Sequence, residues 1–361
     1  MKPPPLNPPA LKTPPPEHRP REDRPLARRI VLLLPGQGAQ RERMAAGLYG
    51  AEPEFTAHMD AFFDALGPDG APLRDTWLRP APNPELADAL LAQPLLFAVG
   101  HALGRTVASW GTGPDTYLGH SVGELAAACL TGVFGPREGA ALMAARSRAL
   151  AGDGAGGMLA VAATPEAMAP FTGGEVAVGA VNGPRQTVLA GPAGPLAAVE
   201  RQLREAGFVV RTLRSSHAFH SPVMRPAADR FAAALAAVPL GAPRGELYSC
   251  RTTRPVRQEE AVQSDFWAGQ LALPVLYWPA LRALLDTAGS DPGLVLLDAS
   301  PDRSLSAPAR RHPAVRGGAS AVVPLLLPDG DGSPADLAQL AAAREQTLRL
   351  REPRPAQAAA S

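Results

Sequence analysis

Residues 119–123 read Gly-His-Ser-Val-Gly, and their surroundings restrict the fold more than any other part of the chain. The apolar pair Tyr117 and Leu118 precedes this motif, and a helix-forming run over residues 124–130 follows it. That order predicts a strand, a sharp turn and a helix, with Ser121 at the turn. Glycines on both sides of a serine permit a strained bend that leaves its Oγ exposed. The alternative is a glycine-rich turn whose serine only caps the helix.

Apolar runs and helical patterns alternate along most of the chain. Residues 30–34 are all apolar and end at Pro35-Gly36, which is typical of a buried parallel strand. From there to about residue 152, short strands alternate with helical patterns, which indicates an α/β fold. We therefore expect residues 29–155 and 215–330 to form one large α/β subdomain with a parallel sheet.

A different pattern occupies residues 156–214. The expected elements are, in order, a strand over 158–163, a helix over 165–171, strands over 176–181 and 187–190, a helix over 196–206 and a strand over 208–213. The order βαββαβ predicts a ferredoxin-like small subdomain, inserted into the larger one.

Both ends of the chain are rich in residues that do not build a core. Eight of the first sixteen residues are proline and the next stretch is mostly charged, so residues 1–28 are expected to be a disordered tail. Residues 331–361 are expected to form a C-terminal helix, followed from about Glu352 by a disordered Pro/Ala-rich tail.

Composition excludes several classes of function. The 35 basic and 34 acidic side chains nearly cancel, which argues against a nucleic-acid partner or an anionic membrane surface. The two cysteines, Cys129 and Cys250, lack metal-ligand spacing, so no metal site is expected and a reducing compartment is favoured. Because no apolar run is long enough to span a membrane and the N-terminus is not a signal peptide, we expect a soluble cytoplasmic protein.

Seven short motifs occur in one order along the chain: Pro-Gly-Gln-Gly-Ala-Gln at 35–40, Gln-Pro at 93–94, Gly-His-Ser-Val-Gly-Glu at 119–124, Ala-Arg-Ser-Arg at 145–148, Gly-Met-Leu-Ala at 157–160, Val-Asn-Gly-Pro at 181–184 and His-Ala-Phe-His-Ser-Pro at 217–222. With these motifs, residues 30–325 resemble the malonyl-CoA:acyl-carrier-protein transacylase family, most closely the acyltransferase domains of polyketide synthases. The family's hydrolase-like α/β core with a ferredoxin-like insertion agrees with the predicted pattern.

The resemblance assigns the catalytic groups. A serine hydroxyl needs a general base within hydrogen-bond reach, and the family pattern makes Ser121 the nucleophile and His220 the base. Residue chemistry alone does not separate His217 from His220. The resemblance also implies that the backbone amides of Gln37 and Val122 form the oxyanion hole.

In this family a backbone carbonyl takes the place of the acid that orients the histidine in a triad. We expect this carbonyl within residues 248–252, which read Tyr-Ser-Cys-Arg-Thr where relatives usually carry Ser-Asn-Val-Thr. Two further departures from the family are Ala39 in place of a serine and Asp-Ala-Ser-Pro at 298–301 in place of Glu-Val-Gly-Pro.

Arg146 matches the family's arginine for the substrate carboxylate. A guanidinium holds a carboxylate through two parallel hydrogen bonds, so Arg146 favours a dicarboxylic acyl donor. The alternative is a surface arginine, the role expected for Arg148. The resemblance further implies that substrate contacts come from His120, Gln93, His217, Phe219 and Asn182.

The block at 217–220 resembles the variant associated with malonyl selectivity, where methylmalonyl-selective relatives carry Tyr-Ala-Ser-His. A bulky Phe219 would occupy the space that an α-methyl group needs. Phe219 as an ordinary core residue is the other interpretation.

These inferences predict a stand-alone, trans-acting acyltransferase that moves a malonyl group from malonyl-CoA to the phosphopantetheine thiol of an acyl carrier protein by a ping-pong mechanism. The setting is polyketide or fatty-acid biosynthesis, no cofactor or metal is bound, and a multimodular synthase is a further candidate partner. The alternatives are an editing acyl hydrolase or a carrier-to-carrier acyltransferase of the same fold, and a non-catalytic carrier-docking module.

Overall fold

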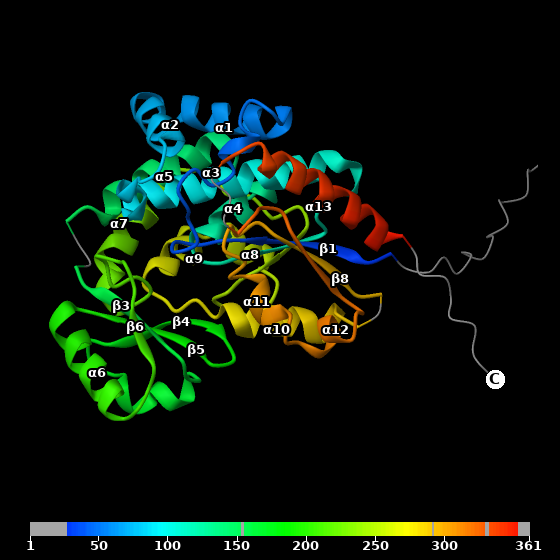
Figure 1. Ribbon diagram of the computed structural model, residues 1–361. Helices are drawn as coiled ribbons and strands as arrows, with labels where there is room; N and C mark the ends of the chain where they lie inside the picture. The colour runs from blue at the N-terminus through cyan, green and yellow to red at the C-terminus, as the bar shows by residue number, and fades with distance from the viewer. Residues whose placement is uncertain (1–26, 153–154, 291, 329–331, 353–361) are drawn as a thin grey trace, which may run out of the picture.

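The larger part of the molecule is built on a five-stranded parallel sheet (Figure 1). The computed structural model describes residues 27–152, 155–290, 292–328 and 332–352. Across the sheet the strands run in the order β7 (Glu246–Tyr248), β2 (Thr116–Gly119), β1 (Arg29–Leu34), β8 (Leu294–Asp298) and β9 (Ala321–Pro324).

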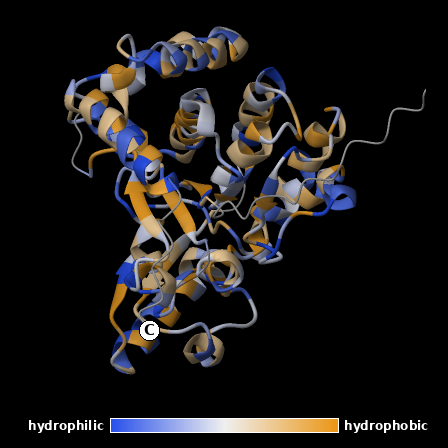
Figure 2. Cartoon of the chain, turned by 90° about the vertical axis from the view of Figure 1, so that its right-hand side faces the viewer, coloured by the Kyte–Doolittle hydropathy of each residue, from blue (hydrophilic) through white to orange (hydrophobic). Residues whose placement is uncertain are grey.

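The central strand β1 is covered on both faces. Side chains alternate along a strand, so Ile30, Leu32 and Leu34 belong to one apolar core and Val31 and Leu33 to the other. All five are completely buried, which explains why the sequence is apolar without interruption there. In Figure 2 the strands in the interior are largely hydrophobic and the helices around them are of mixed character.

Helices cover both faces of this sheet. In Figure 1 the first five helices and the last one lie above it, and a second group lies below it. The upper group comprises α1 (Pro53–Ala65), α2 (Gly70–Leu78), α3 (Ala89–Val107), α4 (Val122–Leu130), α5 (Pro136–Leu150) and α13 (Ala335–Arg351). The lower group comprises α10 (Tyr277–Ala288), α11 (Ser306–Ala309) and α12 (Pro313–Arg316). Among the described residues, the remaining α-helices of the large part are α7 (Arg225–Ala236), α8 (Gln258–Ala261) and α9 (Ser264–Ala268).

A second, antiparallel sheet lies between β2 and β7 in the sequence. Its strands follow the order β4 (Ala177–Gly183), β5 (Gln186–Gly191), β3 (Gly157–Val161) and β6 (Val210–Thr212), with α6 (Ala193–Glu205) before the last strand. This is the strand order of a ferredoxin-like unit, so the predicted fold class is confirmed. One element differs: the helix expected over 165–171 is the 3₁₀ helix η5 (Glu166–Phe171), which contains Pro170. Proline lacks the N–H that a continued α-helix needs.

The small sheet is tied to the large part beside the end of β4. The amide of Val181 donates to the Val275 carbonyl at 2.9 Å, and the amide of Val275 donates to the Gly179 carbonyl at 2.9 Å. These two bonds attach the small sheet directly ahead of α10, and the space between the two parts becomes the candidate site.

The predicted terminal tails lie almost entirely outside the described residues. Of the N-terminal tail, Ala27 is exposed, whereas Arg28 is buried and donates to the Gly318 carbonyl at 2.8 Å, so the packed structure begins slightly earlier than expected. At the other end, α13 supplies the helix expected after residue 331.

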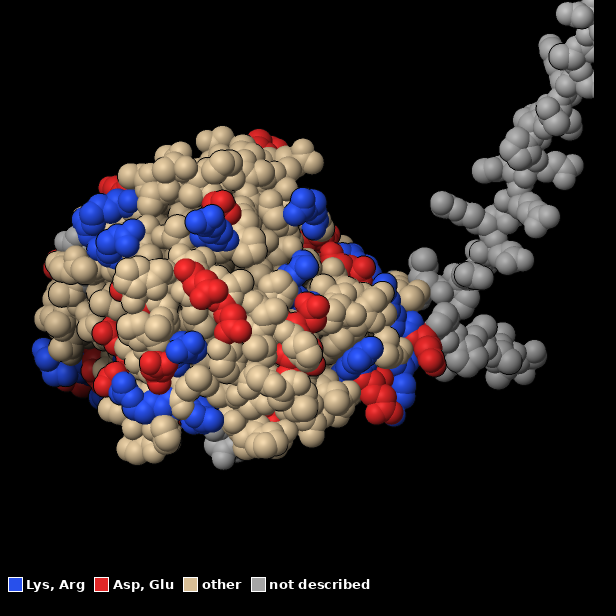
Figure 3. All heavy atoms as spheres, turned by 90° about the horizontal axis from the view of Figure 1, so that it is seen from above, with Lys and Arg blue, Asp and Glu red and all other residues tan. Residues whose placement is uncertain are grey.

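Basic and acidic side chains are interspersed on the face in Figure 3. Within the described ranges, no helix has the length and apolar character needed to cross a bilayer. Those same ranges contain no group of three or more His, Cys, Asp or Glu residues that could hold a metal ion.

Candidate active site

Ser121 occupies the sharp turn between β2 and α4. Its backbone has φ 52° and ψ −120°, an unfavourable conformation for a residue with a side chain. A Cβ on the preceding Gly119 would lie 2.2 Å from the Glu124 nitrogen, so only glycine fits at that position. These are the features of a nucleophile elbow, in which strain holds the serine Oγ at the carboxyl edge of the sheet.

His220 lies within hydrogen-bond distance of this serine. Ser121 Oγ and His220 Nε2 are 2.9 Å apart, and on the other side of the ring Nδ1 lies 2.8 Å from the Gln270 carbonyl oxygen and 3.2 Å from that of Leu273. Since these carbonyls only accept hydrogen bonds, Nδ1 carries the proton and Nε2 is free to accept from the serine. The structure therefore brings together a serine, a base and a backbone group that orients the base.

The expectation that residues 248–252 orient this histidine is wrong. The orienting carbonyls belong to Gln270 and Leu273, whereas the Cys250 amide donates to Glu124 Oε1 at 2.5 Å. The Cys250 thiol donates to the Gly119 carbonyl at 3.0 Å. The segment over 248–252 thus supports the elbow through Cys250, while the ring nitrogens of His220 bond to Ser121, Gln270 and Leu273.

Burial keeps His220 neutral. Desolvation, helped by the nearby His120 and Arg146, lowers the pKa of His220 to about 3. Because the lowered pKa favours the neutral ring, Nε2 is available as a proton acceptor well below neutral pH. His120 is half-buried, and desolvation lowers its pKa in the same direction.

The loop after β1 lies against the elbow. A Cβ on Gly36 would lie 2.6 Å from both the Nδ1 and the carbonyl oxygen of His120, and 3.1 Å from the Ser121 Cβ. This close approach brings the next residue, Gln37, beside the serine. Val122 is the first residue of α4, so its amide has no acceptor within the helix. Gln37 and Val122 therefore both lie close to the nucleophile, and the role of their amides as an oxyanion hole stays a prediction.

Arg146 on α5 is fully enclosed. Its side chain is 1 % exposed, and burial lowers its pKa to about 9, so the guanidinium is charged at neutral pH. Its Nε donates to Gln93 Oε1 at 2.7 Å, and Gln93 Nε2 donates to Gln37 Oε1 at 2.8 Å. Neither Nη1 nor Nη2 of Arg146 has a hydrogen-bond partner among the described residues. Two unpaired guanidinium nitrogens thus lie at the end of a chain of side chains that reaches Gln37 in the loop after β1.

The dyad opens into a cleft of about 1270 Å³ between the two sheets. Ser121, His220, Gln93, His120, Asn182 and Phe219 all line it. His120 Nε2 donates to Asn182 Oδ1 at 2.9 Å, which links the elbow to β4 of the small sheet.

Two predicted substrate contacts lie behind the cleft wall instead. Arg146 does not line the cleft. It is hydrogen-bonded to Gln93, and Gln93 lines the cleft. His217 does not line it either: its ring stacks on Phe219 at 5.2 Å, and its Nε2 lies 3.3 Å from the Leu150 carbonyl oxygen. His217 therefore supports Phe219, which is itself 4 % exposed.

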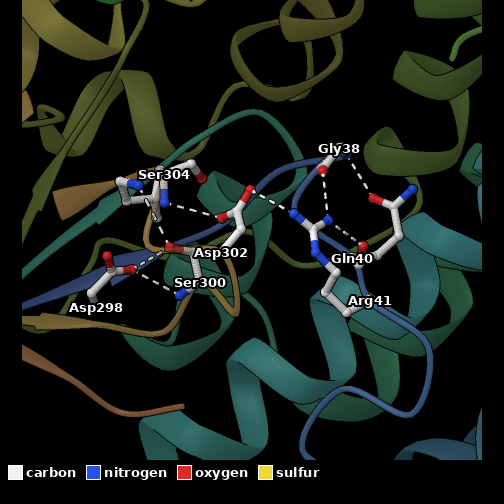
Figure 4. A network of polar contacts seen from close by, with 8 residues as sticks. Gly38, Gln40, Arg41, Asp298, Ser300, Asp302 and Ser304 are labelled. Carbon is white, nitrogen blue, oxygen red and sulfur yellow. Dashed lines mark hydrogen bonds and ion pairs between the residues drawn. The ribbon is translucent and has the colours of Figure 1, made fainter. Parts of the chain in front are cut away.

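A network of polar contacts joins the loop after β1 to the loop after β8 (Figure 4). Arg41 reaches Asp302 at 3.4 Å and donates to the carbonyl of Gln40 at 2.8 Å. Asp298, at the position of the departure from the family motif, accepts from the amides of Ser300 and Ser306 at 2.8 and 3.0 Å. The substituted motif thus builds an ordered loop beside the cleft.

Several site residues were not predicted. Met158 and Tyr277 line the cleft, and Glu124 and Gln270 bond to one another behind the dyad at 2.6 Å. Glu124 is part of the motif at 119–124, so its place in the first turn of α4 could have singled it out. Nothing in the sequence pattern marks Gln270.

Comparison with known proteins gives a consistent result. Residues 31–348 match the family model described as acyl transferase domain. Over 293 residues the chain is 36% identical to a component of the phenolphthiocerol/phthiocerol polyketide synthase of Mycobacterium tuberculosis, an alignment that covers 80% of this chain and 19% of that protein. The chain therefore spans about a fifth of the length of that relative.

Solved structures agree. The acyltransferase domain from the second module of the salinomycin polyketide synthase is 33% identical, with 90% of this chain and 74% of that chain covered and a TM-score of 0.78. The malonyl CoA-acyl carrier protein transacylase from Coxiella burnetii is 22% identical, with 90% and 99% covered and a TM-score of 0.76, and shares the fold. The chain therefore belongs to the acyl transferase domain family, and it is similar to the acyltransferase domains of polyketide synthases.

Proposed function

We propose that this acyltransferase moves a malonyl group from malonyl-CoA to the phosphopantetheine thiol of an acyl carrier protein, through an acyl ester on Ser121. The observation that carries the proposal is the buried, charged guanidinium of Arg146, whose two terminal nitrogens have no partner among the described residues. A buried charge without partners is costly, and a malonyl carboxylate would satisfy both nitrogens once the Gln93 side chain, which lies between Arg146 and the cleft, moves aside. An acetyl group offers nothing to pair with them.

In the first half-reaction, His220 Nε2 takes the proton of Ser121 Oγ as the oxygen attacks the thioester carbonyl. The tetrahedral oxyanion accepts hydrogen bonds from the amides of Gln37 and Val122. When the intermediate collapses, the carbon–sulfur bond breaks and the proton on His220 passes to the departing coenzyme A thiolate. The products are malonyl-Ser121 and free coenzyme A.

The second half-reaction reverses these steps with a new thiol. The carrier's phosphopantetheine thiol gives its proton to His220, and its sulfur attacks the malonyl ester. Ser121 leaves and recovers the proton from His220. The carbonyls of Gln270 and Leu273 support this role, because they stabilise the Nδ1–H of the imidazolium that forms in each half-reaction.

A second groove, next to the active-site cleft, is consistent with a thioester substrate that carries phosphate groups. It measures about 430 Å³, and Ala160, Gln186 and Arg211 line both this groove and the active-site cleft. Arg185 and Arg311 also line it, and its lining includes no acidic side chain among the described residues. A groove with this charge suits the phosphates of coenzyme A or of a carrier's phosphopantetheine.

Intact-mass spectrometry tests the proposal. The protein is incubated with malonyl-CoA, and a single malonyl adduct is expected, which an added carrier protein bearing phosphopantetheine should remove. Peptide mapping should place the adduct on Ser121, and Ser121→Ala should give none. Adducts on Cys129 or Cys250 would contradict the mechanism, and rapid release of malonate into water would indicate a hydrolase.

A further inference from the structure

Glu124 is a buried carboxylate that neither half-reaction uses. It is 5 % exposed and lies in the first turn of α4, three residues after the nucleophile. Its Oε1 accepts from the Cys250 amide at 2.5 Å, and its Oε2 accepts from Gln270 Nε2 at 2.6 Å. Burial raises its pKa, and these hydrogen bonds oppose that rise. Such a costly group requires a reason to stay buried.

Gln270 connects this carboxylate to the catalytic base. Its carbonyl oxygen lies 2.8 Å from His220 Nδ1, and the neighbouring Leu271 carbonyl accepts from the backbone amide of His220 at 2.8 Å. The short η7 helix (Gly269–Leu271) therefore fixes both the ring and the main chain of His220. That main chain is strained, with φ 63°, and needs such support.

We propose that Glu124 is a positioning residue for His220: it fixes Gln270, whose carbonyl holds the imidazole in the orientation that presents Nε2 to Ser121. The contacts form a closed ring: Glu124 bonds to Gln270, Gln270 bonds to His220, and His220 bonds to Ser121. The backbone at the start of α4 then connects Ser121 to Glu124. This role rests on the function proposed above. It adds a residue that acts through another and does not touch the substrate.

The chemistry of the two side chains sets the test. A carboxylate only accepts hydrogen bonds, so Gln270 must turn its amide nitrogen toward Glu124. This leaves Gln270 Oε1 buried and without a partner among the described residues. In Glu124→Gln the new amide oxygen can still accept from Cys250, and its nitrogen can donate to Gln270 Oε1 once the Gln270 amide turns over. In Glu124→Ala the Gln270 side chain has no hydrogen-bond partner at this position.

The experiment measures the single-turnover rate of Ser121 acylation by malonyl-CoA in three variants of the full chain. Glu124→Ala should lower the maximal rate by about 10²-fold, the scale expected for a shift of about 1 Å in a catalytic group. The malonyl-CoA concentration that gives half the maximal rate should hardly change, because the cleft wall is intact. Glu124→Gln should retain most of the wild-type rate. Gln270→Ala should lose rate like Glu124→Ala, since it breaks the same link.

A double-mutant cycle separates positioning from a general loss of stability. If Glu124 acts through Gln270, adding Glu124→Ala to Gln270→Ala should lower the rate little further. The matched control is Ser320→Ala. Ser320 is also buried and bridges two backbone segments, donating to the Gly289 carbonyl at 2.7 Å and accepting from the Leu294 amide at 2.9 Å, at the opposite edge of the sheet. This control should lower Tm and leave the acylation rate unchanged.

Three results would overturn the inference: a folded Glu124→Ala with the wild-type rate, additive losses in the cycle, or a Glu124→Gln as slow as Glu124→Ala. If Glu124→Ala does not fold, Gln270→Ala and Glu124→Gln decide the question by the same rates. Failure of the proposed function is distinguishable, because wild-type protein would then form no malonyl ester on Ser121.

Discussion

At the scale of single residues, Arg146 is unusual because its guanidinium is charged and buried but only partly hydrogen-bonded. One nitrogen of its guanidinium is used by Gln93, and the other two have no partner among the described residues. The ring of Phe231 lies 5.5 Å from its charged carbon, which adds a weak cation–π contact. The arrangement fixes the guanidinium before any substrate arrives.

Replacing Arg146 with alanine should depress malonyl transfer strongly. Loss of a buried, hydrogen-bonded charge pair costs about 2–5 kcal/mol, whereas acetyl transfer should stay the same or improve. Competition between malonyl-CoA and acetyl-CoA, read by mass spectrometry of the acylated protein, measures both effects. The matched control is Arg148→Ala on the same helix, because Arg148 is exposed and should not matter. Equal losses for both acyl groups would show that Arg146 supports the fold and not the carboxylate.

Phe219 should select by size. It lines the cleft next to His220, and His217 supports it from behind. Replacing His217 with Tyr and Phe219 with Ser should raise methylmalonyl transfer relative to malonyl by roughly 10-fold, since one methyl group has a modest cost. The ratio is measured with an equimolar mixture of malonyl-CoA and methylmalonyl-CoA. No change in the ratio would mean that Phe219 serves only as part of the core.

The sequence made some of these residues predictable and not others. Ser121 was singled out by its glycine-flanked position between a predicted strand and a predicted helix, whereas Arg146 was assigned only through the family resemblance. The orienting carbonyl of Gln270 was not predictable, because any residue has a carbonyl and only the folded backbone determines which one faces the imidazole. His217 was expected in the cleft, but the neighbouring Phe219 occupies the wall and leaves the histidine behind it.

At the scale of elements, α3 contains a buried histidine that should affect stability. His101 is 5 % exposed, stacks on Phe97 and meets His58 edge-on. Desolvation, helped by His58 and Arg105, lowers the pKa of His101 to about 3 from its usual 6.5. As the pH falls, the His101 imidazole is therefore protonated in the unfolded chain before it is protonated in the folded protein. Because the unfolded chain then binds more protons, the free energy of unfolding should decrease as the pH falls from about 6.5 to about 3.

In His101→Phe this loss should be smaller. The free energy of unfolding is measured by urea titration at about pH 7.5 and at about pH 5.5. Its decrease between these pH values should be about 1 kcal/mol smaller in the variant than in wild type. Each protein is compared with itself at the two pH values, so the volume change of the substitution cancels. The comparison also cancels the opposite contributions of Glu124 and Asp298, whose pKa values burial raises. Equal acid losses in the two proteins would contradict the assignment.

Elements with one strong physical cause were the predictable ones. The strand at residues 30–34 followed from its uninterrupted apolar run, because a central parallel strand has no solvated face. The expected helix over 165–171 is a 3₁₀ helix, since Pro170 interrupts the α-helical hydrogen bonding. Short segments of this kind depend on local backbone chemistry more than on periodicity.

At the scale of the whole molecule, the site exists only where the two sheets meet. His120 from the elbow and Asn182 from the small sheet join across the cleft, and the arginine-lined groove also takes residues from both parts. The two-part architecture was predictable from the βαββαβ order. The groove was not, because Arg185 and Arg311 are far apart in the sequence and only folding brings them together.

Arg211 provides a test of this shared surface. Arg211→Ala should raise the KM for malonyl-CoA by roughly 2- to 5-fold, the range for an exposed charge pair. The KM for malonyl-pantetheine, which has no phosphate, should stay the same. Arg201→Ala on α6 is the control, since Arg201 is exposed and lines neither the active-site cleft nor the arginine-lined groove. An equal rise for the two thioesters would mean that Arg211 affects the cleft by another route.

The position of β1 in the sheet has a consequence for how the protein is made. One edge of β1 pairs with β2, but the other pairs with β8, which begins only at Leu294. On the ribosome, an apolar strand edge therefore stays unpaired until most of the chain has emerged, a condition that favours aggregation. Ser121 and His220 are both synthesised before that edge closes. Chains that stop short of β8 should carry the complete dyad in sequence and still be both insoluble and inactive.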